Sequence, residues 1–279
     1  MTAAGDPGVL TERSSRIVGA HRLLRRSRRE QTGEFLAEGA QAVREAVSAE
    51  SERPGAVVRE LYLTEAAGAR HTELVRAAFA AGITVTQVTD RAAAALSDTV
   101  TPQGLVARCA LPDSDPALLL AGRPTLLAVL VQAADPGNAG TVVRLADAAG
   151  ADGVIMAGDA VDPFGPKAVR ASAGSVFHLP VVRAADPLAL VADLTAAGLS
   201  VLATTTSAEL DLDAAAASIL DLPTAWLFGS EAHGLPADVI AAADAAVRVP
   251  IHGRAESLNL ATAAAICLYA SASAHRRSR

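Results

Sequence analysis

Long apolar runs that alternate with helix-like segments dominate the chain from Thr125 onward. Five runs rich in Val, Leu, Ile and Ala hold few polar residues: TLLAVLVQAA, GVIMAG, FHLPVV, SVLATTT and TAWLFG. The intervening stretches have helical periodicity; residues 140–149 end at Gly150, and a last helix is expected from about Leu258. Strands that are apolar on both faces are typical of a parallel sheet covered by helices on both sides. We therefore predict an α/β fold with a parallel sheet.

A smaller α/β unit is expected before this region. Strand-like and helix-like stretches alternate from GEFLAEG through VVRELYLT and ITVTQVT to GLVARCAL, which ends near Leu111. The proline-rich segment PDSDPALLLAGRP follows. We predict a first domain over residues 1–111, a linker over 112–124 and a second domain over 125–279.

The composition favours a cytoplasmic protein with a sizeable core. The 279 residues are 51% hydrophobic. The only cysteines, Cys109 and Cys267, have no neighbours at metal-ligand spacing, so we expect a reducing compartment and no metal site. The start of the chain lacks a secretory signal. Residues 257–274 fall short of the ~20 apolar residues of a membrane span, so we expect a buried helix there and no membrane partner.

A cluster of arginines stands out in a chain whose formal net charge is −6. Seven arginines and no acidic residue lie between Arg13 and Arg29. A solvated helix face is one interpretation, and phosphate binding is the other, because like charges this dense repel one another unless an anion neutralises them. The clustering leaves both open.

The segment PGNAGTVVRLADAAG follows the first apolar run of the second domain. Its glycines are wrongly spaced for a dinucleotide-binding turn, which needs three at fixed positions. Asn138 precedes the expected helix, and Thr141, Arg144 and Asp147 share one stripe of it. A helix cap at Asn138 followed by a solvated face is the simplest interpretation, and a functional role for Asn138 and Arg144 is the alternative.

Two further segments place polar residues where a buried sheet does not need them. LFGSEAHGLP puts Gly229, Glu231 and Gly234 directly after an apolar run, and the carboxyl ends of parallel strands are where α/β proteins bind ligands. VPIHGRAESLNL puts Ser257 and Asn259 at the start of the last helix, where one cap would be enough. An ordinary turn and an ordinary cap remain the alternatives.

Taken together, the three segments resemble the SpoU (TrmH-like) branch of the SPOUT RNA methyltransferases. The matching motifs occur in the family's order, over about residues 126–270. They are N-x-G-x-x-x-R at Asn138, Gly140 and Arg144, G-x-E-x-x-G at Gly229, Glu231 and Gly234, and P-I-x-G-x-x-x-S-L-N from Pro250 to Asn259. The run Arg25–Gly39 and the strand TPQGLVA resemble the opening and closing parts of that family's ribosomal-protein-like substrate-binding domain.

The resemblance implies a trefoil knot in the second domain, a homodimer, and S-adenosyl-L-methionine (AdoMet) as cofactor. By position, AdoMet would be held by Gly229, Val249, Ile251 and Leu258. The implied reaction is methylation of a ribose 2′-hydroxyl, with large-subunit (23S) ribosomal RNA as the favoured target. A transfer RNA target and a non-catalytic RNA-binding assembly factor are the alternatives. A nicotinamide-dependent oxidoreductase is disfavoured, because the glycine-rich turn is missing.

The resemblance also assigns roles to individual side chains. The catalytic set would be Asn138, Arg144, Glu231, Ser257 and Asn259. Arg144 would stabilise negative charge on the 2′-oxygen, because a guanidinium with a pKa above ~12 is a poor general base, although family proposals include that role. RNA phosphates would be bound by a second set, Arg22, Arg25, Arg26, Arg28 and Arg29.

Overall fold

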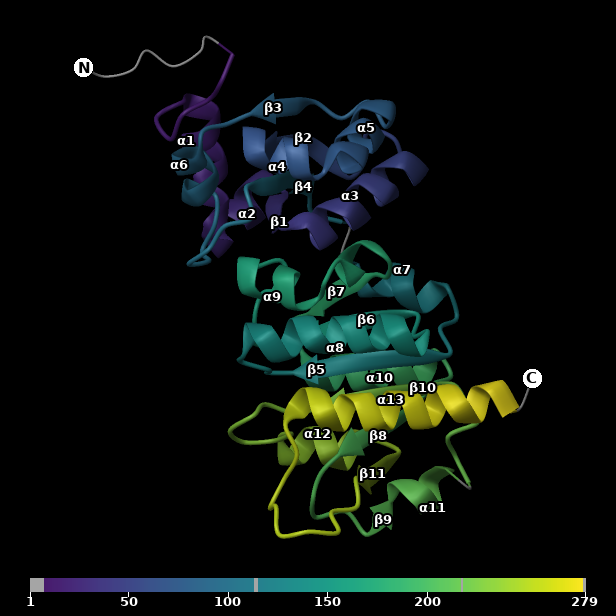
Figure 1. Cartoon of the computed structure of the whole chain (residues 1–279). Coiled ribbons are helices and arrows are strands. Elements are labelled where there is room, and N and C mark those ends of the chain that lie inside the picture. Colours follow the sequence, from purple (N-terminus) through teal and green to yellow (C-terminus); the bar gives the residue numbers. More distant parts are fainter. Residues whose placement is uncertain (1–7, 113–114, 217, 278–279) are drawn as a thin grey trace. The chain divides into compact units, whose positions relative to one another are not determined.

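The chain forms two compact units. The computed structural model describes residues 8–112, 115–216 and 218–277. The first unit contains the described residues up to Pro112 together with Phe164–His178, and the second contains the other described residues. Each unit has its own sheet and its own helices (Figure 1).

The first unit contains a mixed four-stranded sheet in the order β1-β4-β2-β3. Both pairings of β4 are antiparallel, and β2 pairs with β3 in parallel. The strands are β1 (Glu34–Glu38), β2 (Val58–Leu63), β3 (Val85–Gln87) and β4 (Leu105–Ala110). The helical segments are α1 (Ser15–His21), η1 (Arg22–Leu24), α2 (Arg26–Thr32), α3 (Ala40–Glu52), α4 (Glu65–Arg70), α5 (Thr72–Ala80), α6 (Asp90–Ala95), α9 (Pro166–Ala171) and η2 (Ser175–Phe177).

The sheet of the first unit is buried on both faces. On one face Leu36 and Val106 pack against Ile17 of α1 and Leu23 of η1, with residues of α6 in the same cluster. On the other face Phe35 lies 5.1 Å from the ring of Phe164 and 5.8 Å from that of Phe177, measured between ring centroids. The alternation of neighbouring strand residues between two faces produces these two layers.

The second unit contains a seven-stranded sheet in the order β7-β6-β5-β10-β8-β11-β9, and all its pairings are parallel. The strands are β5 (Leu126–Val131), β6 (Gly153–Ala157), β7 (Val181–Ala184), β8 (Ser200–Thr204), β9 (Leu210–Asp211), β10 (Thr224–Phe228) and β11 (Ala245–Arg248). The helices are α7 (Pro116–Ala121), α8 (Pro136–Ala149), α10 (Pro187–Ala196), α11 (Leu212–Ala216), α12 (Ala237–Ala242) and α13 (Leu260–Arg277).

Helices cover both faces of the large sheet, as the apolar strands require (Figure 1). Leu190 of α10 and Val239 of α12 share a buried cluster with Val129 and Leu227 of the central strands. On the opposite face α8 and α13 pack together, and the indole N–H of Trp226 donates to Ser271 Oγ of α13 at 2.9 Å. The predicted α/β class and parallel sheet are confirmed.

Several local predictions differ from the structure. The expected linker 112–124 contains α7, because Asp115 accepts a hydrogen bond from Ala117 N at 2.9 Å and Pro116 occupies the first helical turn. The run FHLPVV begins in η2, so that strand β7 starts only at Val181. The last helix starts at Leu260 rather than at Leu258. The functional boundaries at residues 111 and 125 stay a prediction, because compactness alone does not assign a function to either unit.

Candidate functional site at the carboxyl ends of the strands

The first two predicted segments lie side by side because their strands are neighbours. β5 leads into α8, and β10 leads into the turn that starts at Gly229. The two strands pair in parallel with Leu130 opposite Phe228, so both segments leave the same edge of the sheet. The third segment joins β11 to α13, and α13 packs on both β10 and β5. The topology therefore gathers segments that lie far apart in the sequence.

Asn138 is not the cap of α8. The cap is Asp135, whose side chain accepts from Asn138 N at 2.8 Å, while Pro136 provides the favourable first helical residue. At the other end Gly150 closes the helix with φ +73°, as predicted. The simple interpretation of Asn138 as a cap is wrong, and its side chain is available for other partners.

A hydrogen-bond chain joins the three segments through their side chains. Asn138 Nδ2 donates to Glu231 Oε1 at 2.8 Å, and Asn259 Nδ2 donates to Asn138 Oδ1 at 3.0 Å. Asn259 also caps α13, because its Oδ1 accepts from Ala261 N at 2.9 Å. The amide of Asn138 thus uses its donor toward one segment and its acceptor toward another. This Glu231–Asn138–Asn259 chain is the centre of the candidate site.

Glu231 holds the loop between β5 and α8. Its carboxylate accepts from Ala134 N at 3.0 Å and from Asp135 N at 3.3 Å. Burial raises the pKa of the Glu231 carboxyl, but the hydrogen bonds from Asn138 and from the backbone together outweigh it, so the pKa lies below its usual value. The carboxylate is therefore ionised at neutral pH. Within the described part of the chain, its hydrogen-bond donors are neutral groups, and Arg144 is not one of them.

The turn after β10 requires glycine at Gly229. A side-chain carbon there would lie 2.1 Å from the carbonyl carbon of Gly234, closer than any real side chain approaches. Ser230 and Gly234 exchange backbone hydrogen bonds of 3.1 and 2.9 Å, and Gly234 has φ +69°. The motif G-x-E-x-x-G therefore encodes a closed turn that presents Glu231.

A cavity of about 360 Å³ opens beside this turn. The four residues predicted to bind the cofactor, Gly229, Val249, Ile251 and Leu258, all line it. Ser257 and Glu231 line it as well. The cavity volume lies in the range of small-molecule sites.

Sequence analysis did not identify one further group of residues that lines this cavity. Thr204 ends β8, the other neighbour of β10, and Thr205 and Thr206 follow it; all three line the cavity. Their position at the carboxyl end of a predicted parallel strand could have marked them as site residues, but three threonines suggest no particular chemistry. Lysine and arginine are absent from the described lining residues, and Glu231 is their only carboxylate.

Arg144 and Ser257 are both exposed. The Arg144 side chain projects from α8, and its guanidinium makes no hydrogen bond or ion pair with any residue in the described part of the chain. Arg144, Asn138 and Asn259 do not line the cavity. The site therefore combines a cofactor-sized cavity with an exposed cation, Arg144, on the neighbouring helix α8.

The predicted phosphate-binding arginines divide into two kinds. Arg22, Arg25 and Arg26 are exposed and Arg28 is half-buried. Arg29 is only 4% exposed and donates to the carbonyl oxygen of Leu23 at 2.7 Å, so it holds η1 against α2. The assignment of Arg29 to RNA contacts is therefore corrected: a buried side chain with a backbone partner cannot reach a phosphate.

The described residues contain neither a cluster of metal-ligating side chains nor a membrane-spanning helix. Within residues 8–112, 115–216 and 218–277, no group of three or more His, Cys, Asp or Glu side chains is placed to hold a metal ion. No helix in that same part of the chain combines the length and the apolar character needed to span a membrane. Cys109 and Cys267 are both buried and free.

Fold and site together define an α/β ligand-binding domain joined to a second small domain, and comparison with known families identifies it. Residues 125–269 match the SpoU rRNA Methylase family, and residues 15–107 match the MRM3-like substrate binding domain. The chain belongs to the SpoU rRNA methylase family and is a methyltransferase. The predicted family membership is confirmed.

Relatives and solved structures agree with this result. The 23S rRNA (guanosine(2553)-2′-O)-methyltransferase RlmP of Bacillus subtilis is 33% identical over 86% of this chain and 89% of its own length. An AdoMet-bound rRNA methyltransferase from Sinorhizobium meliloti has a TM-score of 0.79 at 30% identity and covers 97% of this chain and 98% of its own. The SpoU methyltransferase AviRb of Streptomyces viridochromogenes in complex with AdoMet has a TM-score of 0.78 at 32% identity, with 95% and 100% covered.

Proposed function

We propose that the protein is an AdoMet-dependent methyltransferase that modifies ribose 2′-hydroxyl groups of large-subunit ribosomal RNA. The observation that carries the proposal is the meeting of Asn138, Glu231 and Asn259 beside a cofactor-sized cavity. The 23S ribosomal RNA named as the target of the Bacillus subtilis relative supports the choice of RNA.

The cavity suits AdoMet better than a phosphate-bearing cofactor. With no cation among its described lining residues, it offers little to a pyrophosphate, whereas AdoMet has no phosphate and carries a sulfonium cation. Gly229, Val249, Ile251 and Leu258 would hold it, and the missing side chain at Gly229 leaves backbone accessible. Bound AdoMet supplies an activated methyl group.

Arg144 would provide the electrostatic part of catalysis. A 2′-hydroxyl is a poor nucleophile until it loses its proton, which would pass to an RNA phosphate, and negative charge would develop on the oxygen as that proton leaves. A cation beside that oxygen stabilises the transition state. Arg144 is exposed and unpaired in the described part of the chain, so its guanidinium does not need to leave a protein partner.

The other site residues would position the substrate and the loops. Asn138 and Asn259 would orient the ribose, and Ser257 would hold the substrate or its own segment. Glu231 would fix the β5–α8 loop through Ala134 N and Asp135 N. The trefoil knot of this family would involve the segments after β10 and β11, which together line the cavity.

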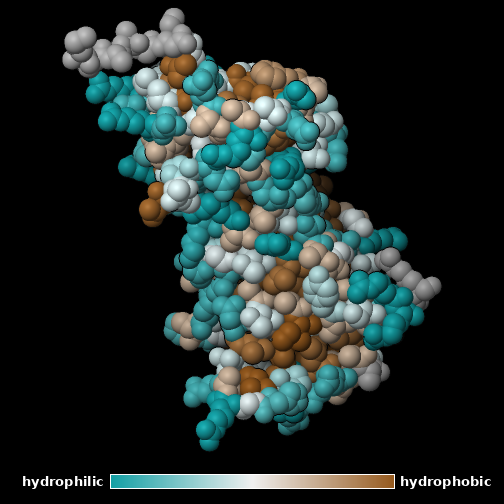
Figure 2. Space-filling model, viewed as in Figure 1, coloured by the Kyte–Doolittle hydropathy of each residue, from teal (hydrophilic) through white to brown (hydrophobic). Residues whose placement is uncertain are grey.

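We also propose that the enzyme is a cytoplasmic homodimer, with α13 at the interface between copies. Hydrophobic residues gather over α13 in Figure 2, and Ile266 and Tyr269 of that helix are 38% and 43% exposed. The Tyr269 hydroxyl lies 3.4 Å from the carbonyl oxygen of Ala148, one turn along α8 from Arg144. A second chain bound here would lie near the unpaired guanidinium.

In this proposal residues 1–111 bind the RNA substrate and residues 125–279 transfer the methyl group. Arg22, Arg25, Arg26 and Arg28 would contact RNA phosphates. The match of residues 15–107 to a substrate binding domain supports this division.

The test is transfer of radiolabelled methyl groups from AdoMet to deproteinised 23S ribosomal RNA from cells that lack this gene. We expect one class of 2′-O-methylated nucleotide, located by mapping of alkali-resistant positions. Label in transfer RNA instead would overturn the choice of target. AdoMet binding without transfer to either RNA would favour a non-catalytic RNA-binding protein.

A further inference from the structure

A second cavity, of about 310 Å³, lies within the first unit. The segment formed by α1, η1 and α2 and the sheet strands β1, β2 and β4 contribute its lining. The exposed Arg22 and the buried Tyr62 both line it, so it leads from the surface to the face of the sheet.

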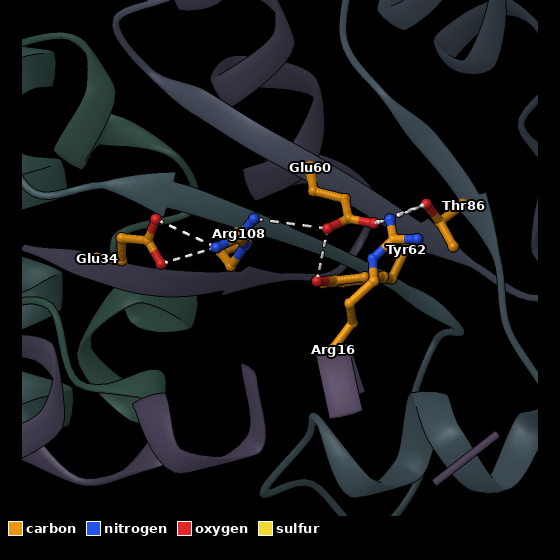
Figure 3. Close-up of polar contacts among 6 residues, drawn as sticks. All are labelled: Arg16, Glu34, Glu60, Tyr62, Thr86 and Arg108. Carbon is orange, nitrogen blue, oxygen red and sulfur yellow. Dashed lines mark hydrogen bonds and ion pairs between the residues drawn. The ribbon is translucent and has the colours of Figure 1, made fainter. Parts of the chain in front are cut away.

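The buried carboxylate of Glu60 lines this cavity, and Figure 3 shows its partners. Glu60 is 3% exposed, and the cost of burying its charge is offset by a full set of partners. It accepts from Tyr62 Oη at 2.8 Å and Thr86 Oγ1 at 2.6 Å, and it forms ion pairs with Arg16 and, at 3.5 Å, with Arg108.

Arg108 connects Glu60 to a second carboxylate. Its Nη1 donates to both oxygens of Glu34, at 3.2 and 3.0 Å (Figure 3). Its Nε is buried and has no hydrogen-bond partner among the described residues. The charges of Glu34 and Glu60 therefore balance those of Arg16 and Arg108, while one buried donor is left unsatisfied.

Two further cations line the cavity without a carboxylate partner. The side chain of Arg22 is exposed, and its guanidinium makes no ion pair or hydrogen bond with the residues that the structure describes. Arg28 donates to Gln31, which is neutral. The cavity therefore has about two uncompensated positive charges near its entrance, which suits an anion such as a phosphate.

The remaining wall is small and apolar. Ala20 and Leu23 are 3% exposed and line the cavity, and a side-chain carbon at Gly19 would meet nothing within 4 Å. Arg108 also lines the cavity, and a guanidinium plane can stack against a flat ring. The half-buried Glu34 carboxylate offers acceptor capacity for N–H groups on the edge of such a ring.

A flat ring with N–H donors and an attached phosphate is a nucleotide. We propose that this cavity binds one unpaired nucleotide of the RNA substrate, with the base inside and the phosphate at Arg22 and Arg28. The nucleotide must be unpaired, because a base within a duplex cannot enter a pocket without leaving its stack. This inference rests on the proposed function, since it assumes that RNA is the substrate.

The first test fills the cavity from α1. Gly19→Leu places a four-carbon side chain at this open position, and Val18→Leu is the control at the neighbouring helix position, which does not line the cavity. Binding of 23S ribosomal RNA should weaken about 10-fold for Gly19→Leu, the effect of losing one stacked base, and stay unchanged for Val18→Leu. AdoMet affinity should be the same for both variants, and neither should melt at a lower temperature than the wild-type protein, because leucine is a better helix former than glycine.

The second test distinguishes a specific nucleotide-binding site from non-specific electrostatic attraction of RNA. Arg22→Gln and Arg25→Gln each remove one exposed positive charge from the same short segment, but only Arg22 lines the cavity. General electrostatic attraction predicts equal losses of RNA affinity. A nucleotide site predicts a larger loss for Arg22→Gln, together with loss of a protection footprint at an unpaired nucleotide.

Three results would overturn the inference. Gly19→Leu could bind RNA as the wild-type protein does while melting normally, or the two arginine variants could lose affinity equally. Guanosine monophosphate could also saturate the cavity while RNA binding stays insensitive to it, which would indicate a free-nucleotide site. These results are distinct from failure of the proposed function, in which the wild-type protein would transfer no methyl group to RNA.

Discussion

Each unit is organised around a glutamate with several hydrogen-bond partners, but the partners differ in kind. Glu60 in the first unit is buried and has two arginines among its partners. Glu231 in the second unit is exposed and accepts from an asparagine side chain and two backbone N–H groups. Both carboxylates are well satisfied, yet only Glu60 neutralises cations.

The difference shows how the same residue type serves two purposes. A buried charge must be paired, so Glu60 and its arginines fix the sheet face against α1 and are strongly interdependent. An exposed carboxylate with neutral donors fixes loop geometry at little cost. The guanidinium of Arg144 has no carboxylate partner among the described residues. The first unit uses its inner arginines for structure, whereas the second keeps its site arginine available.

The largest expected effect is on the stability of the first unit. Glu60→Ala leaves Arg16 and Arg108 without their shared carboxylate and should lower the free energy of unfolding by about 3–5 kcal/mol, measured by urea denaturation. The control is Glu30→Ala, which removes an exposed pair with Arg26 and should cost less than about 0.5 kcal/mol. Similar destabilisation of the two variants would show that burial of the Glu60 ion pairs adds nothing, and the contrast between a buried and an exposed glutamate would fail.

The next effect is catalytic and belongs to the second unit. Arg144→Ala should reduce the single-turnover rate of methyl transfer by about 100-fold or more, because the transition state then lacks one preorganised charge. AdoMet affinity should be almost unchanged, since Arg144 does not line the cavity. Arg144→Lys keeps the charge and should recover part of the rate. A near wild-type rate for Arg144→Ala would contradict the assignment.

Features that depend on extended sequence patterns were predicted correctly from the sequence. Continuous apolar runs identified β5, β6, β8 and β10, and the spacing of the three motifs identified the family. The strands β9 and β11 were missed, because Leu210–Asp211 is very short and Ala245–Arg248 has no long apolar run. Pro116 was included in the proline-rich linker, although it starts α7.

Side-chain partners were the harder part to predict. The cluster of arginines is visible in the sequence, but only the fold separates the buried Arg29 from the exposed Arg25. The Asn138–Glu231 bond joins residues 93 positions apart, and no local pattern contains it. The Glu60 partners likewise come from separate strands and from α1. Local sequence patterns predict helices and strands, whereas the pairing of strands decides which polar side chains come within hydrogen-bonding distance.

A smaller effect concerns the exposed arginines of the first unit. Changing Arg22, Arg25, Arg26 and Arg28 together to Gln should flatten the dependence of RNA affinity on salt by ~0.7 to 0.9 log unit for each phosphate that is no longer neutralised. Arg29 is left unchanged because it is buried. Filter binding at several salt concentrations gives the slope, and AdoMet binding serves as the control. An unchanged slope would mean that this segment is a solvated surface and that RNA is bound elsewhere.

The smallest expected effect is the pH dependence contributed by Glu231. Its pKa is below the usual value in the folded protein, so its carboxylate contributes stability that is present above the unfolded pKa of ~4.3 and is lost as the pH falls through the lower folded pKa. The difference in unfolding free energy between wild-type protein and Glu231→Gln should therefore shrink below about pH 4. The size of the effect should be modest, because the side chain is exposed and its donors are neutral. Carbon-detected NMR titration of the Glu231 carboxyl measures the folded pKa directly. A raised value would show that burial outweighs the hydrogen bonds, and the distinction drawn between Glu231 and the buried Glu60 would then fail.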